Sequence, residues 1–128
     1  MRLLLDTHIA LWAITDNPKL PTRARELILA PVNEIYISAA SVWEIAIKHA
    51  LGRHTIPISG EEARHYFAEA GYITLPITDQ HAAVTETLPP LHADPFDRIL
   101  VAQALTEPLK LVTHDATMAG YSDSILLV

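Results

Sequence analysis

An uninterrupted apolar run that ends in a carboxylate is the feature that most constrains this fold. Leu3, Leu4 and Leu5 lead directly into Asp6. A short continuous run of this kind predicts a strand buried on both faces, as in a parallel sheet covered by helices. A charge at the end of such a strand is costly to bury unless other groups compensate it. Ligands of open α/β sheets bind beyond the carboxyl ends of the strands, so Asp6 is the first candidate functional residue.

Apolar segments alternate with helical segments along the rest of the chain. Predicted strands cover residues 3–5, 35–37, 72–75, 110–113 and 124–128. Predicted helices cover residues 8–14, 23–30, 38–51, 60–70, 78–88 and 95–106. This alternation predicts an α/β sandwich with a mostly parallel sheet. No repeat or long linker divides the 128 residues, so we expect one domain.

Polar residues indicate where two of the helices begin. Ser41 and Glu44 have the spacing of a capping box, but a start at Ser38 is an alternative that places Glu44 in the second turn. Asp94 is a good N-cap, and Pro95 suits the first helical position. Glu44 thus lies on the helix that follows the second predicted strand, and Asp97 lies in the first turn of a late helix.

Composition excludes several classes of function. The chain has no cysteine, so disulfides and thiolate metal sites are excluded. Its seven histidines never have the i, i+4 spacing of a zinc-binding helix. The formal charge of -6 argues against broad electrostatic binding of nucleic acid. It does not exclude a nucleic-acid enzyme, because divalent cations bound at one cluster of acids would neutralise the negative charge there. No secretory signal or membrane-length apolar run is present, so we expect a cytoplasmic protein.

Four carboxylates occupy comparable places at the ends of the predicted elements. Asp6 follows the first strand, Glu44 lies on the helix after the second, Asp97 lies in the first turn of a late helix, and Asp115 follows the fourth strand. Because parallel strands share one carboxyl edge, the four acids are expected to meet there. Carboxylate oxygens are the ligands that Mg²⁺ and Mn²⁺ prefer, and such a site can activate water for phosphodiester cleavage.

Each acid also has a simpler interpretation that the sequence leaves open. Asp6 or its neighbour Thr7 could cap the first helix, Glu44 could be a capping-box partner or an exposed acid, and Asp115 could be a loop acid. For Asp94 the structural role of helix cap is preferred. An acid in the first turn of a helix is favourable in itself, so a structural and a ligand role are compatible at position 97.

The chain resembles a known family at four blocks of residues. The sequence is similar to PIN-domain ribonucleases, and in particular to the VapC-type toxins of bacterial type II toxin–antitoxin pairs. The third block is the most specific of the four. The blocks are LLDTH at 4–8, SVWEI at 41–45, HADPFDRILVAQA at 92–104 and VTHD at 112–115.

The resemblance implies a fold, a site and an activity. The implied fold is a PIN-like three-layer sandwich over residues 1–128, with a mostly parallel central sheet of about five strands flanked by helices. The implied activity is endoribonuclease cleavage of RNA with Mg²⁺, for which Mn²⁺ can substitute. The implied catalytic and metal-binding residues are Asp6, Glu44, Asp97 and Asp115. The implied supporting residues are Thr7, Asp94, Arg98 and Thr113.

The resemblance also implies partners. A toxin of this kind has a cognate antitoxin, commonly forms a homodimer and acts on RNA. The acidic chain would suit a basic antitoxin segment. Trp12 and Trp43 are candidate apolar contacts for it, with burial in the core as the commoner role of such residues. Lys48, Arg53 and Arg98 are candidate RNA contacts, and Arg98 could equally pair with a neighbouring acid.

Three other classes compete with a nuclease. A haloacid-dehalogenase-type phosphotransferase needs a second Asp two positions after the first, where this chain has His8. A phospho-receiver domain needs an Asp after a middle strand and a Lys after a late one, and neither is present at 72–76 or 112–115. A catalytically silent PIN-fold binding module would be favoured by loss of a core acid, but all four acids are present.

Overall fold

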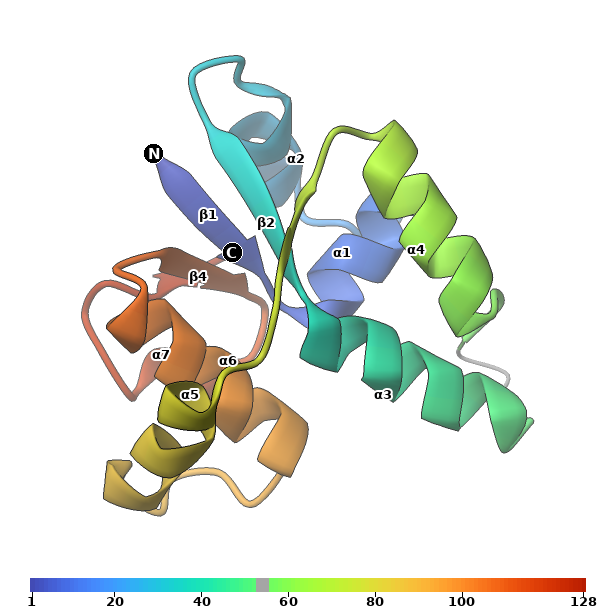
Figure 1. The fold of residues 1–128 in the computed structure, drawn as a ribbon. Helices are drawn as coiled ribbons and strands as arrows, with labels where there is room; N and C mark the ends of the chain where they lie inside the picture. Colours follow the sequence, from blue (N-terminus) through green and yellow to red (C-terminus); the bar gives the residue numbers. More distant parts are fainter. Residues whose placement is uncertain (53–55) are drawn as a thin grey trace.

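A parallel sheet forms the centre of the molecule. The computed structural model describes residues 1–52 and 56–128. In these residues five strands lie in the order β3-β2-β1-β4-β5, and every neighbouring pair is parallel (Figure 1), which confirms the predicted α/β fold. The strands are β1 (Arg2–Leu5), β2 (Glu34–Ser38), β3 (Ile73–Leu75), β4 (Lys110–Thr113) and β5 (Leu126–Leu127).

Helices cover both faces of the sheet and make a three-layer sandwich. One apolar core lies beneath α1 to α4, and a second lies beneath α6 and α7. Within the described residues, no helix combines the length and apolar character needed to cross a membrane. The helices are α1 (Thr7–Ile14), α2 (Thr22–Leu29), α3 (Ala39–Ala50), α4 (Gly60–Glu69), α5 (Asp79–Val84), α6 (Pro95–Thr106), α7 (Ala116–Ala119) and the 3₁₀ helix η1 (Thr85–Thr87).

The leucines of β1 supply both cores. Leu3 and Leu5 belong to the core under α1 and α4, whereas Leu4 belongs to the core under α6. All three side chains are fully buried. Each burial contributes about 1.5–3 kcal/mol relative to an exposed side chain. The apolar run therefore places β1 in the middle of the sheet, and residue 6 follows at its carboxyl edge.

The start of α3 differs from the capping box predicted at Ser41. The cap is Ser38, whose hydroxyl accepts a hydrogen bond from the backbone N–H of Ala40 at 3.0 Å, so the alternative start was correct. Ser41 is fully buried, and its hydroxyl accepts instead from the hydroxyl of Thr7 at 2.9 Å. The reason is that β2 runs straight into α3, and its last residue has the extended backbone that a cap requires. Glu44 consequently lies in the second turn.

Three further elements differ from the predictions. The helix expected over 78–88 ends at Val84 and continues as η1, where the hydroxyl of Thr85 bonds to the backbone oxygen of Ala82. The expected last strand is only two residues long. The one-turn helix α7 was not predicted, because a helix of four residues is too short to show a periodic apolar pattern in the sequence.

Close packing of α3 against α4 at Gly60 gives a first testable prediction. A Cβ at this position would lie 2.7 Å from the Cβ of Ala46. We expect Gly60→Ala to lower the free energy of unfolding by about 1–3 kcal/mol, measured by urea denaturation, because one of the two helices must move. In the double variant Gly60→Ala/Ala46→Gly the space is restored, so its loss should be smaller than the sum of the two single losses. A loss equal to that sum would contradict the close contact.

Candidate active site

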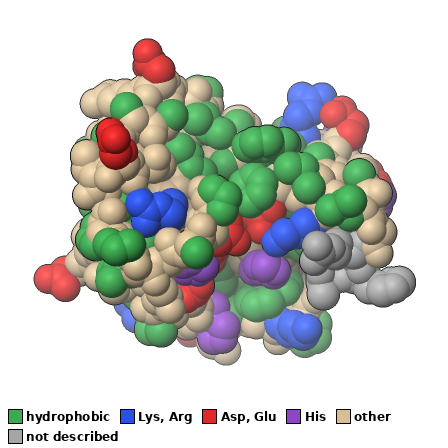
Figure 2. All heavy atoms as spheres, turned by 90° about the horizontal axis from the view of Figure 1, so that it is seen from below, with side chains coloured by type: hydrophobic (Ala, Val, Ile, Leu, Met, Phe, Trp, Pro, Cys, Tyr) green, Lys and Arg blue, Asp and Glu red, His purple; other side chains and the backbone are tan. Residues whose placement is uncertain are grey.

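The four acids singled out in the sequence line one pocket at the carboxyl edge of the sheet. Asp6 follows β1, Glu44 lies on α3, Asp97 lies in the first turn of α6 and Asp115 follows β4. The pocket has a volume of about 480 Å³. Figure 2 shows Asp and Glu side chains gathered near the centre of this face, beside histidines. The structure therefore brings together all four residues.

Asp6 both caps α1 and faces the pocket. The residue is 7% exposed and lines the pocket. One carboxylate oxygen, Oδ1, accepts from the backbone N–H of Thr7 at 2.7 Å, and Oδ2 accepts from the hydroxyl of Thr113 at 2.8 Å. Burial raises the pKa of Asp6, and these two hydrogen bonds oppose the rise. The same hydroxyl of Thr113 accepts from the backbone N–H of Asp115 at 3.0 Å, so it links two of the acids.

Glu44 offers a buried carboxylate oxygen to the pocket. The residue is 3% exposed, and its Oε2 forms an i, i+4 ion pair with Lys48 on the same helix. Its other oxygen, Oε1, is buried and has no hydrogen-bond partner among the described residues. An unpaired buried oxygen of a charged group is costly, and a bound cation would remove that cost.

The carboxyl of Asp97 has a strongly raised pKa in this pocket. Burial and the neighbouring charges of Asp6, Asp94 and Glu44 raise the pKa of Asp97 to about 7, although His92 opposes the rise. Clustered carboxylates disfavour one another's ionised forms in this way, and a divalent cation reverses the effect. The raised pKa of Asp97 therefore reflects burial first, and then repulsion by carboxylates that His92 offsets only in part.

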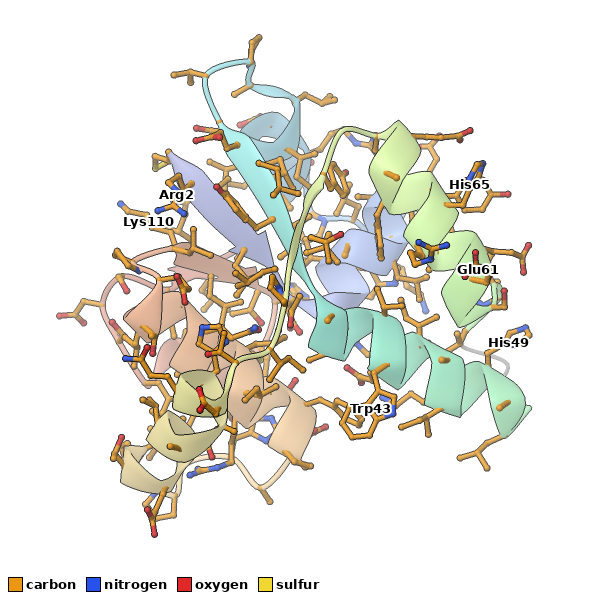
Figure 3. All side chains as sticks on the ribbon, in the orientation of Figure 1. Arg2, Trp43, His49, Glu61, His65 and Lys110 are labelled. Carbon is orange, nitrogen blue, oxygen red and sulfur yellow. The ribbon has the colours of Figure 1, made fainter. Side chains whose placement is uncertain are left out.

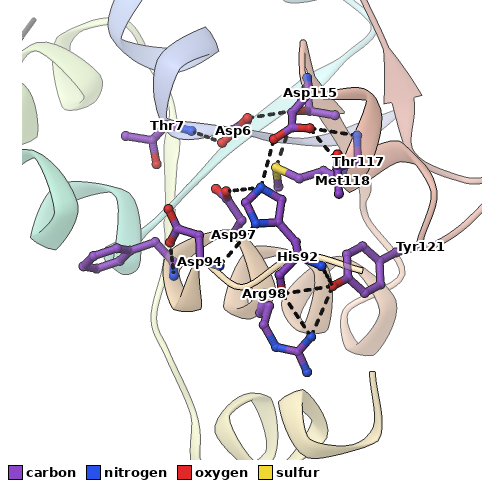
Figure 4. Close-up of polar contacts among 12 residues, drawn as sticks. Asp6, Thr7, His92, Asp94, Asp97, Arg98, Asp115, Thr117, Met118 and Tyr121 are labelled. Carbon is purple, nitrogen blue, oxygen red and sulfur yellow. Dashed lines mark hydrogen bonds and ion pairs between the residues drawn. The ribbon is translucent and has the colours of Figure 1, made fainter. Parts of the chain in front are cut away.

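His92 bridges two of the acids. Its Nε2 donates to Oδ2 of Asp115 at 3.0 Å and also lies 3.0 Å from Oδ2 of Asp97 (Figure 4). The backbone N–H of Asp94 donates to Nδ1 of the same ring, so the hydrogen of a neutral imidazole is placed on Nε2. The backbone N–H of His92 donates a hydrogen bond to the hydroxyl oxygen of Tyr121 at 2.8 Å. The chain thus fixes an N–H donor between Asp97 and Asp115.

Asp115 is the acid with the most hydrogen bonds. Its Oδ1 accepts from the backbone N–H groups of Thr117 and Met118 and so caps α7. Burial tends to raise the pKa of Asp115. The hydrogen bonds from His92 and from these two backbone N–H groups outweigh burial and keep the pKa below its ordinary value. Asp115 is consequently a helix cap as well as a member of the pocket.

The donor set fits a divalent cation. One carboxylate oxygen of Asp97 and one of Asp115 lie within 4.8 Å of each other, with the imidazole of His92 beside both. Asp6 and Glu44 add carboxylates to the same pocket. Several carboxylates together with space for water and phosphate are the surroundings that Mg²⁺ and Mn²⁺ require. A carboxylate cluster able to hold a divalent cation is therefore present.

Arg98 lies outside this pocket. Figure 4 shows its guanidinium directed to Tyr121, and it donates to that hydroxyl at 3.1 Å. No acid forms an ion pair with it among the described residues, so the surface ion pair that the sequence left open as one alternative is not found. Its other bonds hold the loop before α6, through the backbone oxygens of Thr85, Leu88, Pro89 and His92.

The other candidate residues fall in different places. The cap predicted at Asp94 is confirmed, because its Oδ1 accepts from the backbone N–H of Phe96 at 2.8 Å. The ammonium of Lys48 lines the pocket but is paired with an acid. Thr7 assists Asp6 through its backbone rather than through its hydroxyl. Arg53 lies outside the described residues.

The two tryptophans lie on different surfaces. Trp43 is 59% exposed and projects from α3 (Figure 3). Its ring packs edge-on against that of Phe96, with the ring centroids 5.2 Å apart. Burial in the core, the commoner role of a tryptophan, was therefore the wrong interpretation for Trp43. Trp12 packs partly on the core and also lines the acid pocket. Sequence reasoning missed the position of Trp12 in the site, because no local pattern connects α1 with residues far along the chain.

Comparison with known proteins decides the family. The sequence profile of the PIN domain matches residues 3–123. The chain belongs to the PIN-domain family. It is 29% identical over 120 residues to Ribonuclease VapC22 of Mycobacterium tuberculosis, which covers 93% of this chain and 91% of that protein.

Solved structures resemble this PIN domain throughout its length. VapBC2 from Rickettsia felis, bound to a DNA fragment from its promoter, matches with a TM-score of 0.70 at 18% identity, covering 100% of this chain and 98% of that one. FitAcB from Neisseria gonorrhoeae matches with a TM-score of 0.64 at 22% identity, covering 98% and 96%. At these identities the likeness shows a shared fold, which agrees with the predicted sandwich.

The raised pKa of Asp97 predicts how stability depends on pH when no metal is bound. The unfolded chain loses this proton near pH 3.8 and the folded chain near about 7. The free energy of unfolding should therefore fall as the pH rises through that window and stay low above it. The full shift corresponds to about 4 kcal/mol, which solvent screening in the open pocket reduces to about 1–2 kcal/mol. We expect Asp97→Asn to raise stability by that amount at pH 8 in EDTA, measured by thermal and urea unfolding.

Asp115→Asn is the matched control for this experiment. The pKa of Asp115 is lowered in the folded state, so its charge contributes stability that is present above the unfolded pKa and lost as the pH falls. The control should consequently be no more stable than the wild type at pH 8. Equal stabilisation by both substitutions would show that the charge of residue 97 is not the cause.

Proposed function

We propose that this PIN-domain protein is a metal-dependent endoribonuclease acting in the cytoplasm, with residues 1–128 as one catalytic domain. The observation that carries the proposal is the convergence of Asp6, Glu44, Asp97 and Asp115, from four separate elements, on one pocket. The similarity to Ribonuclease VapC22 supports the same activity. A structural explanation alone accounts for Asp6 and Asp115 as helix caps, but within residues 1–52 and 56–128 it leaves the buried Oε1 of Glu44 without a hydrogen-bond partner.

The proposed mechanism is hydrolysis of an RNA phosphodiester by water. Asp6, Glu44, Asp97 and Asp115 would hold Mg²⁺, or Mn²⁺ in its place. When bound, the cation lowers the pKa of a water molecule and offsets negative charge that builds on the phosphate. The hydroxyl of Thr113 orients the Asp6 carboxylate, and the imidazole of His92 orients two others. No side-chain nucleophile is required.

Cleavage by the purified protein tests this proposal. We expect RNA cleavage with Mg²⁺ or Mn²⁺ and none in EDTA, assayed on total RNA by gel and by mapping of the new ends. Asp6→Asn and Asp97→Asn should each reduce cleavage by roughly 100-fold or more, because each removes a charged metal ligand. Asp123→Asn removes a carboxylate at an exposed position outside the pocket, so it should cleave like the wild type. Full cleavage by both active-site variants would assign the activity to a contaminant.

We further propose that the protein is the toxin of a toxin–antitoxin pair and forms a homodimer. The structures named VapBC2 and FitAcB support a protein partner for this fold. The charge of -6 suits a basic antitoxin segment. Exposed Trp43 offers an apolar contact beside a cavity of about 530 Å³.

Expression in bacteria tests the toxin proposal. We expect the wild type to arrest growth when it is produced alone, because RNA cleavage is unopposed, and co-expression of the antitoxin to restore growth. The Asp6→Asn protein, produced to the same level as judged by immunoblot, should not arrest growth. Equal arrest by the two proteins would show that toxicity is independent of the acid pocket.

A further inference from the structure

One side of the acid pocket is aromatic. Trp12 lies between two histidines, with its ring centroid 5.8 Å from that of His8 and 6.3 Å from that of His114. All three rings line the same pocket as the four acids. We call this group, His8, Trp12 and His114, the aromatic wall.

The aromatic wall is carried by the same elements that carry two of the acids. His8 and Trp12 are four residues apart on α1 and so lie on one face of this helix, whose cap is Asp6. Trp12 also packs against the core. His114 directly precedes Asp115, and its Nδ1 bonds to the backbone oxygen of Val128. The distance between the wall and the carboxylates is therefore set by the same elements that place the acids.

The charges of the pocket favour uncharged contacts with an RNA substrate. Lys48 is the one Lys or Arg that lines the pocket among the described residues, and it is paired with Glu44. The chain as a whole carries a charge of -6. Bound cations would hold the scissile phosphate, but they contribute nothing to the neighbouring base. Aromatic side chains bind bases without using charge, because every base has a face that stacks.

We infer that the aromatic wall stacks an unpaired RNA base next to the scissile phosphate. The inference rests on the proposed function and adds the part of the substrate that this pocket recognises. A pocket of about 480 Å³ is large enough for a nucleotide. A base within a duplex is already stacked on both sides and offers no free face. The aromatic wall thus selects RNA whose base at the cleavage site is unpaired.

Substitutions at Trp12 test the inference in the active protein with Mg²⁺. Trp12→Leu keeps an apolar side chain but removes the ring, so we expect KM for a single-stranded oligonucleotide to rise roughly 5- to 100-fold while kcat changes little. Trp12→Phe keeps an aromatic face and should stay within about 3-fold of the wild type. Because Trp12 also packs on the core, thermal unfolding and Mn²⁺ affinity are measured for each variant.

Exposed His8 gives a second series that does not depend on the core. His8→Phe should retain KM and His8→Ala should raise it, by a smaller factor than Trp12→Leu. Equal KM values for the aromatic and aliphatic variants at both positions would overturn the inference. In that case the wild type would still cleave RNA, so the proposed function would stand. Failure of the wild type to cleave with any divalent cation would instead overturn the proposed function.

Tryptophan fluorescence supplies a direct signature of stacking, because the chain has two tryptophans. After rapid mixing with the oligonucleotide, we expect the fluorescence of the wild type and of Trp43→Phe to fall and then recover as the RNA is cleaved. Trp12→Phe, in which Trp43 is the remaining tryptophan, should show no such change. The same RNA annealed to its complement should produce no fall. A fall that persists in Trp12→Phe, or that duplex RNA produces equally, would overturn the inference.

Discussion

The burial of the Asp6 carboxylate at the end of a central strand is the constraint on which the rest of the site depends. The apolar run of β1 places this charge at the carboxyl edge of the sheet with 7% of the residue exposed. The N–H of Thr7 and the hydroxyl of Thr113 each satisfy one of its oxygens. Since the hydroxyl of Thr113 also accepts from Asp115, the pairing of β1 with β4 determines where two of the four acids lie.

The acids are only partly neutralised by the chain itself. Lys48 pairs with one oxygen of Glu44, and His92 lies between Asp97 and Asp115. Two consequences remain: the pKa of Asp97 is raised, and one oxygen of Glu44 has no hydrogen-bond partner in the part of the chain that the structure describes. A divalent cation would remove both, which is the physical basis for assigning the pocket to metal-dependent chemistry. An acidic protein can then bind RNA through cations at the phosphate and aromatic rings at the base.

Local patterns were enough to predict most elements of the fold. The apolar run before Asp6 predicted a central buried strand, and Asp94 with Pro95 predicted the start of α6. These predictions succeeded because strand burial and helix capping depend on residues a few positions apart. The start of α3 was less certain, because Ser38 and Ser41 both fit a cap. The end of β2 decided between them, and the side chain of Ser41 entered the core to bond Thr7.

The sequence by itself was enough to predict that Asp6, Glu44, Asp97 and Asp115 reach one edge of the sheet. It was enough because parallel strands joined by helical crossovers all end at the same edge. Only the tertiary structure decided which other side chains meet those acids there. His92 reaches Asp115 across 23 positions, and Trp12 meets His114 from the other end of the chain. Such contacts follow from the order of the strands in the sheet, with β1 beside β4, which no local pattern of residues specifies.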